Sequence, residues 1–313
     1  MIITGKRRRS LSYLYPWQHR VCIDNKQNSS DLEDYQIKVS ITDSGMIAKM
    51  KEDGGDIRFY AGLTKLSYWI EKKTSSEMIV WVKVPSIPGS STTRIYMYYG
   101  NPSASSESNG EVVFEFFDDF EETSLDTNKW TKIRGTVDIV DGKLKLTGSG
   151  EIWGSSTGGA QVRSNIKFDG NFAIYSLVSI TTTDAGYPRA GVLFYVDDGN
   201  WATNMRRYDH YSSPPRWTQH FAVEAGNSNK RQKNVVENIN PVYLKLTKEG
   251  NTYKAYYSED GISYTFLDSY EYNIGVPYTV CSVETFYDSA TGYFYYIFVC
   301  KYTDPEPTIT IEN

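Results

Sequence analysis

The stretch Ala190–Tyr211 decides the fold class, and it reads AGVLFYVDDGNWATNMRRYDHY. Its first part, Ala190–Tyr195, is apolar and strand-forming, and the turn residues Asp197-Asp198-Gly199-Asn200 follow soon after. An Asp-Gly pair between strand-like runs is typical of a β-hairpin, because both residues tolerate the left-handed backbone of a tight turn. The stretch therefore predicts a pair of antiparallel strands.

The same arrangement recurs on both sides of this hairpin. Further Asp-Gly turns occur at Asp141-Gly142, Asp169-Gly170 and Asp260-Gly261. We expect strands around them at Lys143–Thr147, Phe172–Ile180, Val242–Lys248, Thr252–Ser258, Thr279–Phe286 and Tyr293–Lys301. In the first half, Tyr35, Ile37, Val39 and Ile41 repeat with period two, as a half-buried strand requires. Other strands are expected there at Gln18–Asp24, Asp56–Tyr60, Leu66–Glu71, Met78–Val84 and Thr93–Tyr99, with a short helix at Ser44–Met50. Many short strands predict an all-β protein of two antiparallel β-sandwiches.

Chain length and a polar loop set the domain boundaries. A chain of 313 residues exceeds the usual size of one domain, and the Ser- and Asn-rich loop Gly100–Gly110 is the best boundary. We expect a basic N-terminal arm over 1–15, a first β-sandwich over 16–112, a second over 113–302 and an extended tail over 303–313. In the tail, Pro305 and Pro307 make a rigid spacer and Thr308–Ile311 alternates. The tail would therefore add to a sheet edge of the body or serve self-assembly with virion or filament partners.

The charge balance restricts the partners. Basic residues number 33 and acidic residues 38, and the net charge of −5 argues against nucleic-acid binding by the folded body. The basic run Lys6–Arg9 is either a solvated arm or an arm that contacts a polyanion or a partner. No stretch is long and apolar enough for membrane insertion, and no signal peptide is visible. An extracellular, cell-surface or virion location would therefore need a removed leader or another route of release.

A series of short motifs runs in order along the first half. It consists of Trp17-Gln18-His19-Arg20, Asp34-Tyr35-Gln36-Ile37, Gly55-Asp56-Ile57-Arg58-Phe59, Tyr68-Trp69-Ile70-Glu71, Val80-Trp81-Val82-Lys83-Val84-Pro85, Tyr98-Tyr99-Gly100-Asn101-Pro102 and Phe116-Phe117-Asp118-Asp119-Phe120. The series resembles an uncharacterised domain family of archaeal and bacterial surface proteins. The resemblance implies a surface context, and it implies no particular molecular function.

A second set of motifs covers Phe114–Tyr302. It begins with Phe117-Asp118-Asp119-Phe120, Leu125-Asp126 and Trp130, and continues late in the chain with Leu244–Thr247, Gly250-Asn251-Thr252-Tyr253 and Ser258–Gly261. This region resembles the concanavalin-like jelly roll of lectins and some glucanases. The resemblance implies that the second sandwich is a concanavalin-like jelly roll, a fold that carries many unrelated functions.

Candidate catalytic groups are scarce. A glucanase of this fold would carry Glu-x-Asp-x-x-Glu, which sets carboxylates about 5 Å apart on one strand face, and the pattern is absent from the sequence. The nucleophile-elbow motif Gly-x-Ser-x-Gly is matched by Gly154-Ser155-Ser156-Thr157-Gly158. That motif requires a helix after the serine, whereas strand-like sequence follows here. The acidic residues Asp118, Asp119, Glu121 and Glu122 fit a capped strand end, and no spaced partner accompanies His19, His210 or His220. We therefore expect no enzymatic activity.

Residues 187–220 hold the densest group of candidate ligand-binding side chains. Flat rings cover the apolar faces of sugars, and polar groups at the rim bind the hydroxyls. Each ring has a competing assignment to the sandwich core. The candidates for glycan binding are Tyr187, Arg189, Trp201, Asn204, Arg206, Tyr208, His210, Tyr211 and Trp217.

Two smaller features have alternative interpretations. Asp197 and Asp198 would suit calcium, but an Asp-Gly turn needs no metal, so no cofactor is required. If Thr279–Phe286 and Tyr293–Lys301 form a hairpin about Ser289–Gly292, then Cys281 and Cys300 face each other. The pair would be a disulfide outside the cell and two thiols in a reducing cytosol.

Three functions follow, in order of preference. The first is non-enzymatic surface recognition, with glycans or glycoproteins on a cell surface as partners and attachment to a host or cell surface as the role. The second is a structural protein of a virion or cell-surface assembly without glycan binding. The third is a glycoside hydrolase whose motif is degenerate or unrecognised.

Overall fold

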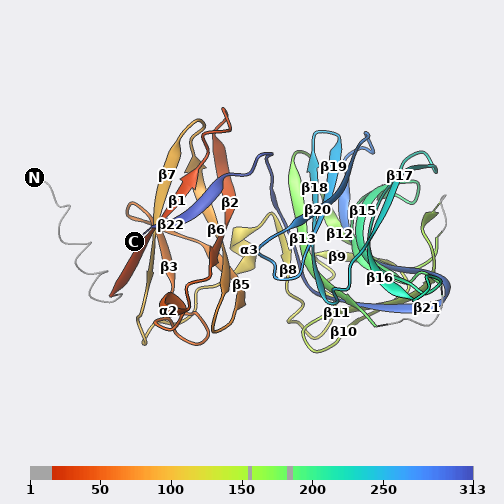
Figure 1. The fold of residues 1–313 in the computed structure, drawn as a ribbon, viewed down its shortest axis with the longest axis horizontal. Helices are drawn as coiled ribbons and strands as arrows, with labels where there is room; N and C mark the ends of the chain where they lie inside the picture. Colours follow the sequence, from red (N-terminus) through yellow and green to blue (C-terminus); the bar gives the residue numbers. More distant parts are fainter. Residues whose placement is uncertain (1–15, 154–156, 182–185, 313) are drawn as a thin grey trace, which may run out of the picture. The chain divides into compact units, whose positions relative to one another are not determined.

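The structure, a computed structural model, describes residues 16–153, 157–181 and 186–312. The chain divides into two compact units: unit 1 comprises Met1–Glu115 and Asp304–Asn313, and unit 2 comprises Phe116–Thr303 (Figure 1). The predicted basic arm with Lys6–Arg9 lies outside the described residues. In the part of the chain that the structure describes, no helix is long and apolar enough to cross a membrane.

Unit 1 is a sandwich of two antiparallel sheets (Figure 1). One sheet has the strand order β22-β1-β7-β3-β4 and the other has the order β2-β6-β5. The strands are β1 (Trp17–Asp24), β2 (Leu32–Ile41), β3 (Arg58–Ala61), β4 (Thr64–Leu66), β5 (Tyr68–Lys73), β6 (Met78–Ile87), β7 (Thr92–Tyr99) and β22 (Thr308–Glu312). The short helices are α2 (Ser44–Ile47), which Asp43 caps through the N–H groups of Gly45 and Met46, and α3 (Gly110–Val113).

Alternation along the strands builds the core of unit 1. Tyr35, Ile37, Val39 and Ile41 of β2 are all buried in one apolar cluster, as their period predicts. The expected single strand Leu66–Glu71 is wrong, because the chain changes sheets at its second residue. Leu66 ends β4 in one sheet and Tyr68 begins β5 in the other.

The C-terminal tail forms the edge strand β22 of unit 1. β22 pairs with β1 from Asp24↔Thr308 to Arg20↔Glu312. Ile309 and Ile311 pack against the core cluster. The amide groups of Gln27 and Asn28 donate to the carbonyls of Glu306 and Pro305 at 3.0 and 2.9 Å. The alternating residues of the tail therefore pair with a strand of the same chain.

We predict that unit 1 depends on this edge strand. Replacing Ile309 and Ile311 together by Ala should lower the free energy of unfolding by about 1–3 kcal/mol, because both side chains are half-buried against the core. Urea unfolding is the measurement, and Thr308→Ala, at an exposed position of the same strand, is the matched control. An unchanged midpoint in the double variant would contradict the role of β22.

Unit 2 is a jelly roll of two antiparallel sheets that share one strand, β21. The β14 sheet has the order β9-β12-β21-β14-β15-β16-β17. The β13 sheet has the order β10-β11-β21-β13-β18-β19-β20, with β8 also paired to β21. The all-β fold with a jelly-roll second domain is confirmed.

The strand bounds of unit 2 follow the predicted rhythm of short strands, with one exception. They are β8 (Phe116–Asp118), β9 (Trp130–Arg134), β10 (Thr136–Ile139), β11 (Leu144–Gly150), β12 (Ala160–Lys167), β13 (Phe172–Ile180), β14 (Arg189–Asp197), β15 (Asn200–Asp209), β16 (Arg216–Glu224), β17 (Asn229–Val236), β18 (Val242–Glu249), β19 (Thr252–Ser258), β20 (Thr265–Glu271) and β21 (Tyr278–Lys301).

The exception is β21, which continues for 24 residues where the sequence predicted a hairpin. Its first part pairs with β12 and β14 and its second part with β11 and β13. At the predicted turn the register against β11 jumps, from Gly148↔Ala290 to Gly150↔Thr285, and Asp288 has φ 46°. A residue with left-handed backbone geometry can form a bulge within a strand as well as a turn between two strands. The sequence therefore marked a real irregularity near Asp288, but the chain does not reverse direction there.

The predicted pairing of Cys281 with Cys300 is wrong for the same reason. Cys281 lies opposite Val162 and Val192, and Cys300 lies opposite Ala173. Because both cysteines belong to one continuous strand, they cannot face each other across a ladder. Both thiols are free and buried.

The acidic residues at the start of unit 2 have a structural role through Asp118. One Asp118 oxygen accepts the indole N–H of Trp130 at 2.6 Å, and the other accepts the N–H of Phe120 at 2.8 Å. Burial raises the pKa of Asp118, and these hydrogen bonds act in the opposite direction. The carboxylate therefore fixes the bend between β8 and the loop that leads to β9.

Candidate functional site

One face of the β14 sheet points away from the inter-sheet core, and we call it the outer face. Val192 and Phe194 join the main core, whereas Leu193 and Tyr195 point outward, because side chains alternate along a strand. The outward cluster consists of Ile152, Leu193, Tyr195, Trp201, Met205, Ala222 and Val280. Trp153 packs on it, with its ring centroid 4.9 Å from that of Trp201. The segment after β11 therefore covers part of the outer face.

The outer face is hollowed beside Trp153. The hollow measures about 330 Å³ and is lined by Glu151, Trp153, Tyr187, Arg189, Arg207, Gln232 and Phe286. We call it the Arg207 hollow. Phe286 is 53% exposed, because the bulge of β21 leaves residues 286–289 outside the core. Aromatic rings, guanidinium groups, an amide and a carboxylate thus meet at one place.

A row of paired residues crosses the outer face at the hollow. Glu284 of β21 pairs with Arg189 of β14, which pairs with Arg207 of β15, which pairs with Thr218 of β16. Arg189 is only 4% exposed; its Nη2 bonds to Glu151 and lies 3.9 Å from Glu284 Oε2. Burial raises the pKa of Glu284, while the charge of Arg189 and the N–H of Ile152 lower it. Two carboxylates therefore flank one buried cation.

His220 lies in the next row and is neutral at physiological pH. Its Nδ1 is 2.8 Å from Oδ1 of Asn234, and because an amide oxygen only accepts, Nδ1 carries the proton. Burial, reinforced by the positive charges of Arg189 and Arg207, holds its pKa well below the ordinary value, against the opposite effect of the Asn234 bond. The imidazole is therefore a packing and hydrogen-bonding group on this face.

The nine predicted glycan ligands divide between the two faces of the β14 sheet. Tyr187 and Arg189 line the hollow; Tyr211 packs its edge on Tyr187 at 5.4 Å, with His210 beside it. Trp201 lies on the outer face but is 0% exposed beneath Trp153. It is a core residue, and its predicted contact with a ligand is wrong.

Asn204, Arg206, Tyr208 and Trp217 belong to the opposite, inward face and do not line the hollow. Asn204 and Arg206 are 0% exposed, which contradicts a ligand contact, whereas ligand binding by the half-buried Tyr208 and Trp217 stays a prediction. Arg206 lies over the Trp217 ring at 4.6 Å and donates from Nη1 to the Glu237 carbonyl at 2.7 Å. Burial lowers its pKa to about 9, with Glu237 acting in the opposite direction. Asn204 is buried and donates to the carbonyls of Lys245 and Tyr256. The physical reason is the period of two: Arg207, not Arg206, shares a face with Arg189.

Five residues of the hollow were missed: Glu151, Trp153, Arg207, Gln232 and Phe286. They come from segments far apart in the sequence, which only the strand order β21-β14-β15-β16-β17 brings together. A register assignment for β14 and β15 would have found Arg207. No sequence signal marks the others.

Asp197 and Asp198 both have protein partners in the β14–β15 turn. Asp197 accepts the N–H of Gly199 and the amide of Asn200, and Asp198 accepts Tyr195 Oη and Arg134 Nη2. Among the described residues, no group of three or more His, Cys, Asp or Glu side chains could hold a metal ion. The turn interpretation accounts for both carboxylates. Ser156 of the elbow-like motif lies outside the described residues.

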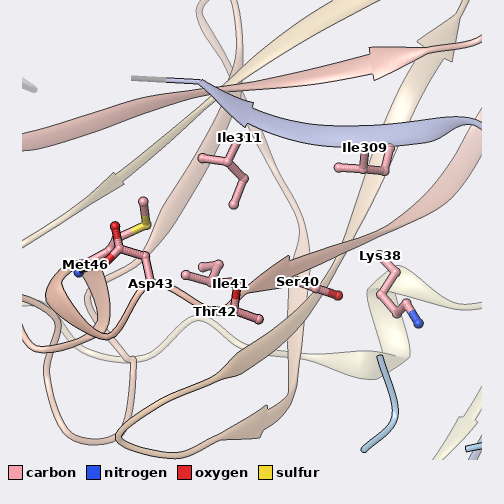
Figure 2. Close-up of a pocket in the computed structure, with 8 residues that line it drawn as sticks. All are labelled: Lys38, Ser40, Ile41, Thr42, Asp43, Met46, Ile309 and Ile311. Atoms are coloured by element: carbon pink, nitrogen blue, oxygen red, sulfur yellow. Dashed lines mark hydrogen bonds between the residues drawn. The ribbon is translucent and has the colours of Figure 1, made fainter. Parts of the chain in front are cut away.

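Unit 1 has a hollow of about 380 Å³ between β2 and β22 (Figure 2). Its lining is Lys38, Ser40, Ile41, Thr42, Asp43, Met46, Ile309 and Ile311. Figure 2 shows Ile309 and Ile311 reaching from β22 toward β2. The Asp43 carboxylate is used to cap α2. This hollow lies where two edge strands do not pair, and its lining residues include no aromatic ring, unlike those of the Arg207 hollow.

Comparison with known proteins identifies a family match and a shared fold. A family described as a domain of unknown function (DUF2341) matches residues 53–133, which run from before β3 into unit 2. No curated protein matches the chain.

Solved structures resemble the chain at low sequence identity. A Bacteroides ovatus protein described as xyloglucan PUL GH43B is 14% identical over 76% of this chain and 46% of its own, with a TM-score of 0.50. The GH43 protein BlXynB of Bacillus licheniformis is 15% identical over 74% of this chain and 46% of its own, with a TM-score of 0.49. A Bacillus licheniformis β-glucanase is 10% identical over 60% of this chain and 98% of its own, with a TM-score of 0.44.

This chain spans less than half the length of those two GH43 structures. At such identities the likeness concerns the fold and not the activity. It defines the chain as an all-β protein whose jelly-roll fold is shared with carbohydrate-active proteins.

We predict that Trp201→Ala costs stability and not recognition. Removing a fully buried indole from the outward cluster should lower the free energy of unfolding by about 3–5 kcal/mol. Tyr211→Ala, which removes a 56% exposed ring from the turn after β15, should change it by less than about 0.5 kcal/mol. Equal midpoints for the two variants in urea unfolding would show that Trp201 is not a core residue.

A second prediction concerns pH. The folded-state pKa of His220 is depressed, so the unfolded chain takes up a proton at this residue first, at about pH 6.5. The free energy of unfolding of the wild type should therefore fall, relative to His220→Gln, as the pH drops below about 6.5 toward the lower pKa of the folded state. Above that pH the two curves should run parallel. Urea unfolding over a pH series measures this, and parallel curves throughout would refute the buried neutral imidazole.

Proposed function

We propose that the chain is a non-enzymatic glycan-binding protein and that the Arg207 hollow is its binding site. The observation that carries the proposal is the lining of the hollow. Trp153, Tyr187 and Phe286 offer ring faces for the apolar sides of sugar rings, and Arg189, Arg207, Gln232 and Glu151 offer donors and acceptors for hydroxyls. Attachment to a glycan-bearing surface is the role that such a site would serve.

A glycoside hydrolase is the second candidate, because Glu151 and Glu284 both lie at Arg189 and the pKa of Glu284 is raised. Retaining hydrolysis needs two carboxylates about 5 Å apart with the sugar between them. Here the guanidinium of Arg189 occupies the place between the carboxylates, and Glu284 is 1% exposed. This arrangement favours binding over hydrolysis.

The proposal predicts that Tyr187→Ala removes binding without unfolding the protein. A glycan array identifies a bound oligosaccharide, and calorimetry with that oligosaccharide should show at least about tenfold weaker binding by the variant. Tyr272→Ala, which removes a 39% exposed ring elsewhere in unit 2, is the matched control and should bind like the wild type.

The two candidates are separated by a reducing-sugar assay on the same oligosaccharide. Binding without release of reducing ends supports the proposal. Release that disappears in both Glu284→Gln and Glu151→Gln would replace it by the hydrolase. No binding to any glycan of the array would refute the function itself.

A further inference from the structure

The charges of the Arg207 hollow are unevenly compensated. Arg189 has Glu284 as its cross-strand neighbour on one side and Glu151 bonded to Nη2. Arg207 has Arg189 on one side and Thr218 on the other. Like charges directly opposite on adjacent strands are destabilising. The row therefore ends in a cation with no carboxylate opposite it on either neighbouring strand.

Arg207 has ring contacts in place of an ion pair. Its Cζ lies 4.2 Å from the centre of the Tyr187 ring, and among the described residues its guanidinium makes no hydrogen bond or salt bridge. Burial lowers the pKa of Arg207, the charge of Arg189 adds to this effect, and Asp209 and Tyr187 oppose it. Stacking on Tyr187 holds the planar group at the hollow and leaves its donors available.

A second, independent feature lies beside it. Arg189 is 4% exposed and its Nε is buried without a hydrogen-bond partner, although the residue lines the same hollow. A buried donor without a partner is unfavourable unless a ligand or water accepts from it. The hollow thus contains an unpaired buried N–H next to a guanidinium that has no ion pair among the described residues.

These features suit an anion: Arg189 and Arg207 are the cations of the lining, and its carboxylate, Glu151, is bonded to Arg189. A hollow of similar volume near Tyr257 is lined by Glu237, Glu259 and Asp260, which would repel an anion. The chain as a whole is acidic, with a net charge of −5. The cationic row is therefore a local property of the hollow and not of the surface in general.

We propose that the Arg207 hollow selects acidic glycans, with an anionic substituent of the sugar bound by Arg207 and by Nε of Arg189. This inference rests on the proposed glycan-binding function. A carboxylate or a sulfate offers oxygens in the planar or trigonal array that a guanidinium binds through two parallel N–H groups. Tyr187 and Gln232 then contact the ring and the hydroxyls of the same sugar.

The test compares matched acidic and neutral probes by calorimetry. The carboxylate pair is oligogalacturonate and its methyl ester, and the sulfate pair is a carrageenan oligosaccharide and the same oligosaccharide after desulfation. We expect one acidic probe to bind at least about tenfold more tightly than its neutral partner, a difference of 1.4 kcal/mol. Raising the salt concentration should reduce that preference, because the hollow is partly open to solvent.

Variants assign the preference to Arg207. Arg207→Gln should weaken binding of the acidic probe more than binding of the neutral probe, so that the acid-to-neutral ratio falls to within about twofold. Its melting temperature should not fall, because the substitution removes a like-charge contact. Arg207→Lys keeps the charge without the planar fork and should retain part of the ratio. Arg216→Gln, the same charge change at an exposed position of β16, should behave as the wild type.

The outcomes separate this inference from the function on which it rests. Neutral probes that bind as tightly as acidic ones, in a manner sensitive to Tyr187→Ala, overturn the acidic preference and leave glycan binding in place. An equal loss in Arg207→Gln and Arg216→Gln also overturns it, because the effect would then be one of net charge. Absence of binding by every probe and by the array overturns both.

Discussion

The shared strand β21 is the constraint on which unit 2 depends. A strand that belongs to two sheets must turn its side chains from one sheet to the other, and β21 does so at the bulge around Asp288. Before the bulge, Cys281 and Val283 face the inter-sheet core, and Glu284 takes the opposite, outer face opposite Arg189. After the bulge, Phe294 returns to the core. The extra residues of the bulge have no place in either sheet, and they carry Phe286 to the hollow. One irregularity therefore closes the core and supplies a wall of the site.

Much of the fold could be predicted from period and turn chemistry, and the failures have a common cause. Alternation at Tyr35–Ile41 and the Asp198-Gly199 turn identify strands and hairpins, because they express local geometry alone. The same turn-forming residues can make a hairpin turn, where the chain reverses direction, or a bulge, where the strand continues. Which of the two forms depends on the strands that pair with the residues after it, and local geometry does not show this. The predicted hairpin near Ser289–Gly292 failed on this point. The strand expected at Leu66–Glu71 failed similarly, since the chain changes sheets there without any turn residue.

The site was predictable only in part, because β14 and β15 are buried on both faces. In a strand with one wet face, polar residues mark the exposed side; in β15, Asn204 and Arg206 are polar and point inward, while Trp201 and Met205 are apolar and point outward. The hydropathy of a residue in β15 therefore does not show which face of the sheet its side chain lies on. The high density of aromatic residues led to predicted ligand-binding residues on both faces. Tyr187 and Arg189 were predicted from the density of aromatic and basic residues over 187–220, and the rest of the lining depends on how the strands are ordered in the folded sheet.

Arg206 and Arg207 show how neighbouring identical residues acquire different roles. The inward guanidinium is fixed by the Glu237 carbonyl and the Trp217 ring, both of which are groups of the protein itself. The outward guanidinium stacks on Tyr187 and faces Arg189, a like charge, across the ladder. A sheet selected for stability alone would place Glu or Gln at position 207, opposite Arg189. Departures from local rules without a compensating structural contact concentrate at functional positions. The like-charge pair of Arg207 and Arg189 is therefore consistent with the anion site proposed for the Arg207 hollow.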